Sequence, residues 1–456
     1  MRKHPRNTVE DEEDVLTDFE PEDLEKTGED GWSDPDEDEP EHSGHTRKGG
    51  KRSKAGRLSW YERVAWNKIG ILLLVLAVAV GAVLAVLAFV RTSKKKSLYA
   101  DAKNAIAQGD YQNAAAKLEQ AIEYGSKDAK YLLGTLYLNG DGVEKDETKG
   151  QALCNEAFEE GSDYAYYCRA MEDLEEYVDT GDAAKLSDCQ NKLEQSDEPD
   201  ATYQRSLLLR VSGDADGADQ LLETAVKGGS LGAICDQAQY KIYAGDYDGA
   251  LDVLKKYAYQ DDLDLQAATA WVKLHQGDTS SWQNLINLAN NGCGLANAYL
   301  GDIYYDGLIA GQERDFGKAA QYYQIASKAD CMRGRIGLSL TMLVNGNGYY
   351  EKSFAVAVNA YRRGYVNAGS ILGNLMYEGL GTEEKHEGMQ YIIAAANNCY
   401  APAEMYLASY YYKEGDTDKC YEYLERAYKH DSRADANRNL EAYLGNSDGF
   451  GADTFY

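Results

Sequence analysis

The feature that most constrains this fold is a small residue that returns about every 34 positions along the chain. Alanine fills this position, with intervals of 36, 169, 34, 34 and 33 residues, at Ala121, Ala157, Ala326, Ala360, Ala394 and Ala427. The longest interval equals five units of about 34 residues, so the period continues through the middle of the chain. Such a unit accommodates one pair of helices, and pairs bury a continuous core only by stacking. The sequence therefore predicts an array of helical pairs.

A second small residue marks the first helix of each unit. It follows a leucine or isoleucine at Leu300-Gly301, Ile336-Gly337, Leu372-Gly373 and Leu407-Ala408. Glycine inside a helix lowers the stability of the helix by roughly 1 kcal/mol, so its recurrence at this position needs a structural explanation. We expect the neighbouring helix to approach too closely for a side chain at this position.

Glycine-aspartate turns recur in the least regular part of the array, between residues 181 and 278. They are spaced by 32 residues, at Gly181-Asp182, Gly213-Asp214, Gly245-Asp246 and Gly277-Asp278. Glycine supplies the backbone freedom that ends one helix, and aspartate caps the next. We count nine or ten helical pairs in residues 99–431, followed by a candidate capping helix and loose tail in 432–456.

Two segments resemble known repeat families. Residues 100–125, with a turn at Gly109-Asp110-Tyr111, resemble a tetratricopeptide repeat, and residues 129–161 resemble its Sel-1-like relative. The second resemblance rests on Ala129, Leu133, Gly134, Tyr137, Gly140, Gly142, Val143, Asp146, Ala157 and Gly161. The pattern returns less completely at 296–330, 334–364 and 368–398. It implies an all-α superhelical solenoid with a concave inner surface that binds a protein or peptide.

One segment is apolar enough to span a membrane. Residues 69–90 contain no charge and no proline, and as a helix they would rise about 33 Å, which matches a bilayer core. A cleaved signal peptide fits badly because 68 polar residues precede the segment. A buried core helix is disfavoured because apolar residues occupy every face. We therefore predict one transmembrane helix.

The flanking charges predict how this helix is oriented. Residues 1–46 hold 18 acidic and 4 basic side chains and are expected to form a disordered cytoplasmic tail. The juxtamembrane segment 47–68 carries eight lysines and arginines, whereas the linker 91–98 carries four. This bias favours a cytoplasmic N-terminus and an external solenoid, in a single-pass cell-membrane protein of bacterial type. All eight cysteines follow the span, which agrees with an oxidising compartment.

Small residues and charge also bear on the partners. Ala77, Gly81 and Ala85 recur every four residues in the span, which would allow close packing of two such helices in a homodimer. Residues 97–456 hold 57 acidic and 31 basic side chains, a net charge of −26, so nucleic acid is disfavoured as a partner.

The sequence offers no motif for catalysis, a cofactor or a metal. The histidines of the array, His275, His386 and His430, lie on different repeats, and no nucleophile elbow or phosphate-binding loop is present. Cys154 and Cys168 flank Gly161 at equal distances and form a candidate disulfide. We favour a non-catalytic protein-interaction scaffold. The alternatives are a transmembrane signalling component, which couples external binding to the acidic tail, and, less favoured, a cell-envelope enzyme.

Overall fold

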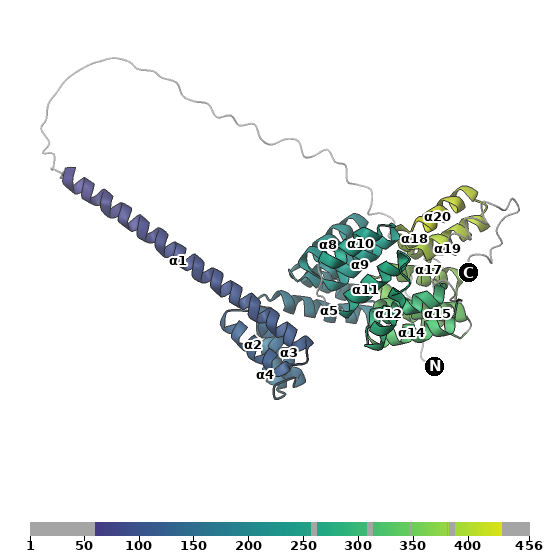
Figure 1. The fold of residues 1–456 in the computed structure, drawn as a ribbon, viewed down its shortest axis with the longest axis horizontal. Coiled ribbons are helices and arrows are strands. Elements are labelled where there is room, and N and C mark those ends of the chain that lie inside the picture. The colour runs from purple at the N-terminus through teal and green to yellow at the C-terminus, as the bar shows by residue number, and fades with distance from the viewer. Residues whose placement is uncertain are drawn as a thin grey trace, which may run out of the picture. The chain divides into compact units, whose positions relative to one another are not determined.

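The computed structural model describes residues 60–256, 262–307, 313–346, 348–380, 382 and 388–430. Within these ranges every regular element is a helix, as predicted (Figure 1). The expectations for 1–46, 47–59 and 432–456 lie outside the described residues. The elements are α1 (Trp60–Ala107), α2 (Tyr111–Glu123), α3 (Lys127–Asn139), α4 (Glu147–Glu159), α5 (Asp163–Thr180), α6 (Ala183–Glu194), α7 (Pro199–Ser212), α8 (Ala215–Gly228), α9 (Leu231–Tyr243), α10 (Tyr247–Lys256), α11 (Leu263–His275), α12 (Ser281–Asn290), α13 (Gly294–Asp306), α14 (Phe316–Lys328), α15 (Met332–Asn345), α16 (Tyr350–Arg362), the short 3₁₀ helix η1 (Val366–Ala368), α17 (Gly369–Glu378), α18 (Gly388–Asn397), α19 (Ala401–Lys413) and α20 (Thr417–His430).

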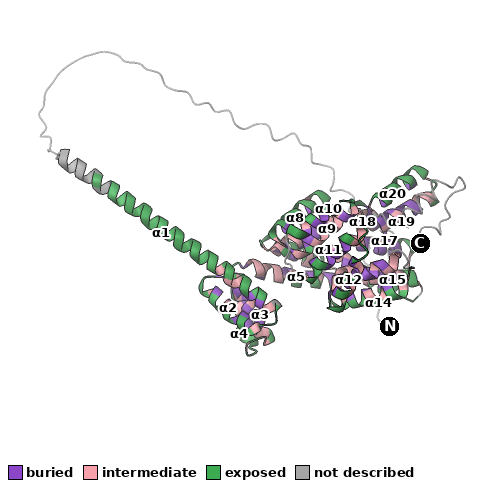
Figure 2. Ribbon diagram, in the orientation of Figure 1, coloured by how far each residue is buried: buried purple, intermediate pink, exposed green. Residues whose placement is uncertain are grey.

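Within the described part of the chain, the helices follow one another as ten antiparallel pairs. The end of α1 shares a hydrophobic cluster with α2 and forms pair 1 with it. Helices α3 and α4 form pair 2, and the series continues to α19 with α20 as pair 10. Buried residues lie along the facing sides of these helices (Figure 2). The buried residues of successive pairs form a series of hydrophobic clusters along the array.

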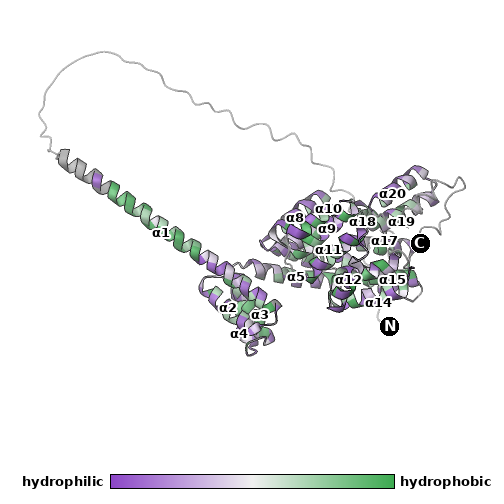
Figure 3. Cartoon of the chain, viewed as in Figure 1, coloured by the Kyte–Doolittle hydropathy of each residue, from purple (hydrophilic) through white to green (hydrophobic). Residues whose placement is uncertain are grey.

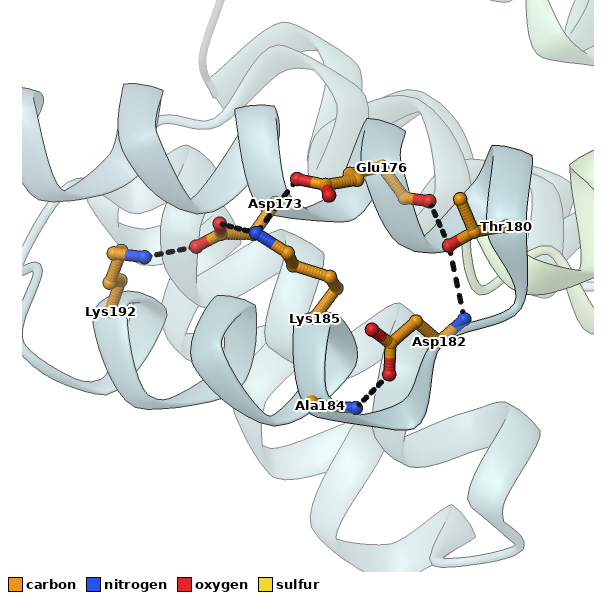
Figure 4. A network of polar contacts seen from close by, with 7 residues as sticks. All are labelled: Asp173, Glu176, Thr180, Asp182, Ala184, Lys185 and Lys192. Atoms are coloured by element: carbon orange, nitrogen blue, oxygen red, sulfur yellow. Dashed lines mark hydrogen bonds and ion pairs between the residues drawn. The ribbon is translucent and has the colours of Figure 1, made fainter.

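The turn of pair 3 illustrates how the sequence sets the helix ends (Figure 4). Gly181 ends α5 in the left-handed region with a φ of 75°, and the Asp182 carboxylate accepts a hydrogen bond from the Ala184 amide at 2.9 Å. Lys185 reaches back to Glu176 at 2.8 Å and so ties α6 to α5. The predicted glycine-aspartate turns are confirmed, because Gly213, Gly245 and Gly277 also have positive φ.

The predicted close approach at small residues is confirmed. A Cβ on Gly134 would lie 2.6 Å from the Cys154 sulfur, and one on Gly373 would lie 2.3 Å from the Gly388 carbonyl oxygen. Of the six recurring alanines, five are fully buried, at Ala121, Ala157, Ala326, Ala360 and Ala427. The prediction is wrong for Ala394, which is only half-buried, because Ala395 fills the core position instead.

Tyr323 shows how adjacent pairs share space. Its ring lies between Gly301 of its own pair and Gly337 of the next, and a Cβ on either glycine would come within 2.5 Å of a ring atom. The Tyr323 hydroxyl donates to Asp302 at 2.7 Å. Gly301 and Gly337 therefore leave the space that the fully buried ring of Tyr323 occupies.

Helix α1 is the one described helix that is long and apolar enough to cross a membrane. Every side chain from Ile71 to Val90 is exposed, and the apolar stretch is clear in Figure 3. Leaving so much apolar surface in water would be costly, so the segment is compatible with a single-pass anchor. Residues 91–98, expected as a linker, continue α1 as helix.

From pair 3 onward the array coils tightly enough for successive turns to touch. Helix α5 contacts α16, α7 contacts η1, and α9 contacts α20. Each contact joins a pair to the one five places later. We call this inter-turn contact the seam.

The seam is built from specific polar and steric contacts. Arg362 donates to the Val178 carbonyl at 2.8 Å, and Arg363 forms a two-pronged ion pair with Glu175. Gln204 donates to the carbonyl of Arg363 at 2.7 Å. Gly364 has no room for a side chain, because a Cβ there would lie 2.6 Å from that of Leu207.

Candidate functional site

A cavity of about 450 Å³ lies among the helices of the array. Most of its lining comes from the first helices of five consecutive pairs, α7, α9, α11, α13 and α15. Residues 364–367 and 398–402 of the following pairs add the part beside the seam. The cavity volume falls in the range that holds small ligands or side chains of a partner.

An aromatic and charged network holds one wall in place. Trp271 and Tyr299 stack with ring centres 4.5 Å apart, and the Arg333 guanidinium lies 5.0 Å from the Tyr299 ring centre. Arg333 also donates to Asp302 at 2.7 Å and to Gln239 at 3.2 Å. This wall is therefore pre-organised by stacking, a cation–π contact and an ion pair.

The side near the seam is held by Arg210 and Asn398. Arg210 donates to Asn398 at 2.9 Å and to Asp219 at 2.5 Å, and its guanidinium lies 4.9 Å from the ring centre of Tyr240. Asn398 in turn donates to Asn367 at 2.9 Å. Side chains more than 150 positions apart in sequence therefore meet at the cavity edge.

Asp236 is a further carboxylate that lines the cavity. Its one hydrogen-bond partner among the described residues is the Tyr203 hydroxyl, which donates to it at 2.6 Å. Burial raises the pKa of Asp236, while the Tyr203 hydrogen bond and the charges of Arg210 and Arg333 lower it. Burial and the negative charge of Asp236 also raise the pKa of Tyr365.

The predicted cysteine pair lies in one hydrophobic cluster. Cys154 is buried there and Cys168 packs against the same cluster, and both are free thiols in the structure. The Cys154 thiol donates to the Tyr131 carbonyl at 3.7 Å. The disulfide stays a prediction.

The structure also places the histidines and three more cysteines. His275 and His430 both line the cavity although they lie on different repeats, whereas His386 lies outside the described residues. Cys293 and Cys331 directly precede α13 and α15, whereas Cys399 lies one position earlier relative to α19. Cys399 adopts a φ of 58°, in the left-handed region that glycine usually fills.

Sequence reasoning did not identify the cavity residues. Tyr203, Asp236, Arg333 and Tyr365 belong to four different pairs, and only the coiling of the array brings them together. The abundance of tyrosine was the available signal. Among the described residues no group of three or more His, Cys, Asp or Glu side chains could hold a metal ion.

Comparison with known proteins identifies the repeat type. A family model described as Sel1 repeat matches residues 127–162, 294–331 and 401–432. These segments correspond to pairs 2, 7 and 10. No curated protein matches the chain.

Several solved structures are similar to the chain. The protective antigen c5321 of uropathogenic Escherichia coli is 17% identical, with 79% of this chain and 81% of that chain covered and a TM-score of 0.30. A Sel1 repeat protein from Oxalobacter formigenes is 17% identical, with 49% and 93% covered and a TM-score of 0.30. The TPR domain of P58(IPK) is 15% identical, with 76% and 96% covered and a TM-score of 0.19. The predicted resemblance to Sel1 repeats is confirmed in the three segments that the family model matches, and every regular element of the described residues is a helix.

Proposed function

We propose that this chain is a non-catalytic scaffold, displayed at a membrane by α1, whose solenoid holds a protein or peptide on its concave face. Sel1 and tetratricopeptide-like repeats typically mediate protein–protein interaction. The observation that carries the proposal is the cavity, where five consecutive first helices present aromatic and charged side chains. Aromatic anchors within a partly enclosed surface are typical of binding hot spots.

Site-specific photo-crosslinking of the full-length protein tests this proposal. A photoreactive phenylalanine at Tyr243, which lines the cavity, should give defined protein adducts in cells. The matched control places it at Tyr428, which is 47% exposed and does not line the cavity. Equal adducts at both positions, or none at Tyr243, would contradict a partner held in the cavity.

The orientation of the span forms part of the proposal. We infer a cytoplasmic N-terminus and an external solenoid, because basic residues are more numerous before the apolar segment than after it. A membrane-impermeant maleimide should label a cysteine introduced at exposed Asp252 in intact cells. The same label should not reach a cysteine introduced at Thr8 until the cells are opened.

A transmembrane signalling role is the second candidate. Gly81 has no heavy atom within 4 Å of where its Cβ would lie, and Ala77 and Ala85 are also exposed. This stripe could receive a second copy of the helix. Gly81→Ile should then weaken self-association in membranes, whereas Val83→Ile should not; unchanged association in both would exclude dimerisation through the stripe.

The Cys154–Cys168 disulfide accompanies an external location. The two thiols share a cluster, and an oxidising compartment favours their bridging. Alkylation without reductant followed by mass spectrometry should find a linked peptide pair in protein isolated from cells. Complete alkylation of both thiols would show that they are free and would contradict the disulfide.

A further inference from the structure

Asp236 is one of five aspartates that line the cavity, Asp236, Asp264, Asp302, Asp306 and Asp330, which outnumber the two arginines of the lining, Arg210 and Arg333. Asp236 lines the cavity and forms no ion pair with any described residue; its single hydrogen bond comes from the uncharged Tyr203 hydroxyl. That hydrogen bond occupies one carboxylate oxygen, Oδ2. The second oxygen, Oδ1, remains free to accept from a ligand.

The other charged groups around it are already committed. Arg333 is paired with Asp302, and Arg210 with Asp219. Asp302 also accepts from Tyr323, and Asp264 accepts from the Cys293 thiol at 3.2 Å. An anionic ligand would have to compete with these carboxylates for the two arginines, whereas a cation would meet an acceptor that is still available.

The surroundings of Asp236 suit a compact cation. Burial disfavours the charged form of Asp236 and so raises its pKa, and a cation bound beside the carboxylate would offset that cost. Tyr203, Tyr240 and Tyr365 line the same cavity as Asp236, and burial, followed by the charge of Asp236, raises the pKa of each of these tyrosines. These tyrosines offer further oxygen acceptors and apolar ring surface for an aliphatic chain.

We propose that the cavity binds an aliphatic ammonium group, with Asp236 as its counter-ion and the tyrosine hydroxyls beside it as further acceptors. The group is carried either by a lysine side chain of a bound protein or by a free diamine. Only the lysine source rests on the proposed scaffold function. The ammonium is favoured over a guanidinium because it is a compact charge that one carboxylate and neighbouring hydroxyls can surround.

Isothermal titration of the full-length protein in detergent tests this inference with defined probes. The probes are cadaverine, the peptide acetyl-Ala-Ala-Lys-Ala-Ala-amide and, as uncharged control, 1,5-pentanediol. Asp236→Asn keeps the shape and a partner for Tyr203 but removes the charge, and should weaken binding of an ammonium probe about ten- to a hundredfold. The matched control Asp252→Asn removes an exposed carboxylate from α10 and should leave binding unchanged.

The outcomes separate the two sources and the alternatives. Tighter binding of the peptide supports a lysine side chain, and tighter binding of cadaverine supports a free diamine. Binding of neither probe, equal binding of pentanediol, or equal affinity of Asp236→Asn and the wild type would overturn the inference. Tyr203→Phe provides a second test, which does not depend on the folding of Asp236→Asn. This variant removes one hydroxyl acceptor and should lower the affinity for cadaverine severalfold while its thermal stability stays unchanged. A failed crosslink at Tyr243 would count against the scaffold but not against diamine binding.

Discussion

Pairs 1 and 2 differ from pairs 3 to 10 in how they are stabilised. The first two pairs bury compact clusters formed by neighbours in sequence, around Leu118 and Ala157. Pairs 3 to 5 and pairs 8 to 10 have such neighbours too, but the seam joins these two sets by hydrogen bonds between residues 150 to 188 positions apart. Local stacking is therefore sufficient to form a repeat, whereas the cavity lies in the part of the array that the seam closes.

This difference has an energetic consequence. A solenoid held only by nearest-neighbour contacts can unfold from its ends, one unit after another. Contacts between pair 3 and pair 8 join distant units, so unfolding of either one exposes polar groups of the other. We expect pairs 3 to 10 to unfold as one cooperative block and pairs 1 and 2 to open separately.

The largest effect is expected from Gly364→Ala. Its φ is 102°, and the new Cβ would lie 2.7 Å from the Leu207 carbonyl carbon across the seam. We expect a loss of about 3 kcal/mol in unfolding free energy, measured by denaturant titration. Gly213→Ala is the control, since its φ is 95° but no atom lies within 4 Å of the added Cβ; it should cost about 1 kcal/mol. Equal losses would show that Leu207 does not restrict the seam.

Gly142→Ala tests the independence of the first two pairs. Gly142 lies in the turn between α3 and α4 with a φ of 67°, and a Cβ there would lie 2.3 Å from the Tyr111 carbonyl carbon. We expect local destabilisation of about 2 kcal/mol. Hydrogen exchange should accelerate in α2 to α4 and stay unchanged in α9 to α15. Faster exchange throughout would mean that the array is a single cooperative unit.

Arg362→Ala should weaken the seam more mildly. It removes the donor to the Val178 carbonyl and leaves that group without this hydrogen bond, at a cost of about 1 to 2 kcal/mol. Arg335→Ala is the control because its partner Asp330 is 85% exposed, and it should change stability by less than about 0.5 kcal/mol. Limited proteolysis should cut Arg362→Ala faster than the control. Identical cleavage rates would show that this hydrogen bond does not stabilise the seam.

The smallest effect concerns pH at the last helix. Hydrogen bonding with Cys399 and then with buried Glu404 raises the pKa of His430 to about 9. Because the folded pKa lies above the usual value of 6.5, this stabilisation is complete below about pH 6.5 and is lost as pH rises through about 9. The melting-temperature difference between wild type and His430→Gln should shrink from about pH 6 to about pH 9.5. A constant difference would contradict protonated His430 as the stabilising form.

The sequence was sufficient for the local part of this structure. Glycine at Gly181 and aspartate at Asp182 act within a few residues, so their spacing predicts where helices end. Gly134 and Ala157 face a neighbour in the same pair, and their small size predicts that contact. These features depend on chemistry that a short window of sequence contains.

The cavity and seam could not be predicted in the same way. They depend on the small rotation between adjacent pairs, which accumulates over five units before Arg362 reaches Val178. No local pattern specifies that rotation. Asp236 illustrates the same limit, because only the coil brings its carboxylate beside Tyr365 of another turn.

The five-pair spacing of the seam restricts how this array could change in length. Inserting or deleting one unit between α5 and α16 would shift every later pair by one place. Arg362 would then no longer face Val178 of pair 3. Duplications before α5 leave the pairing of pair 3 with pair 8 intact. Variation in repeat number should therefore be tolerated at the N-terminal end of the array, while the coiled part behaves as a block of fixed length.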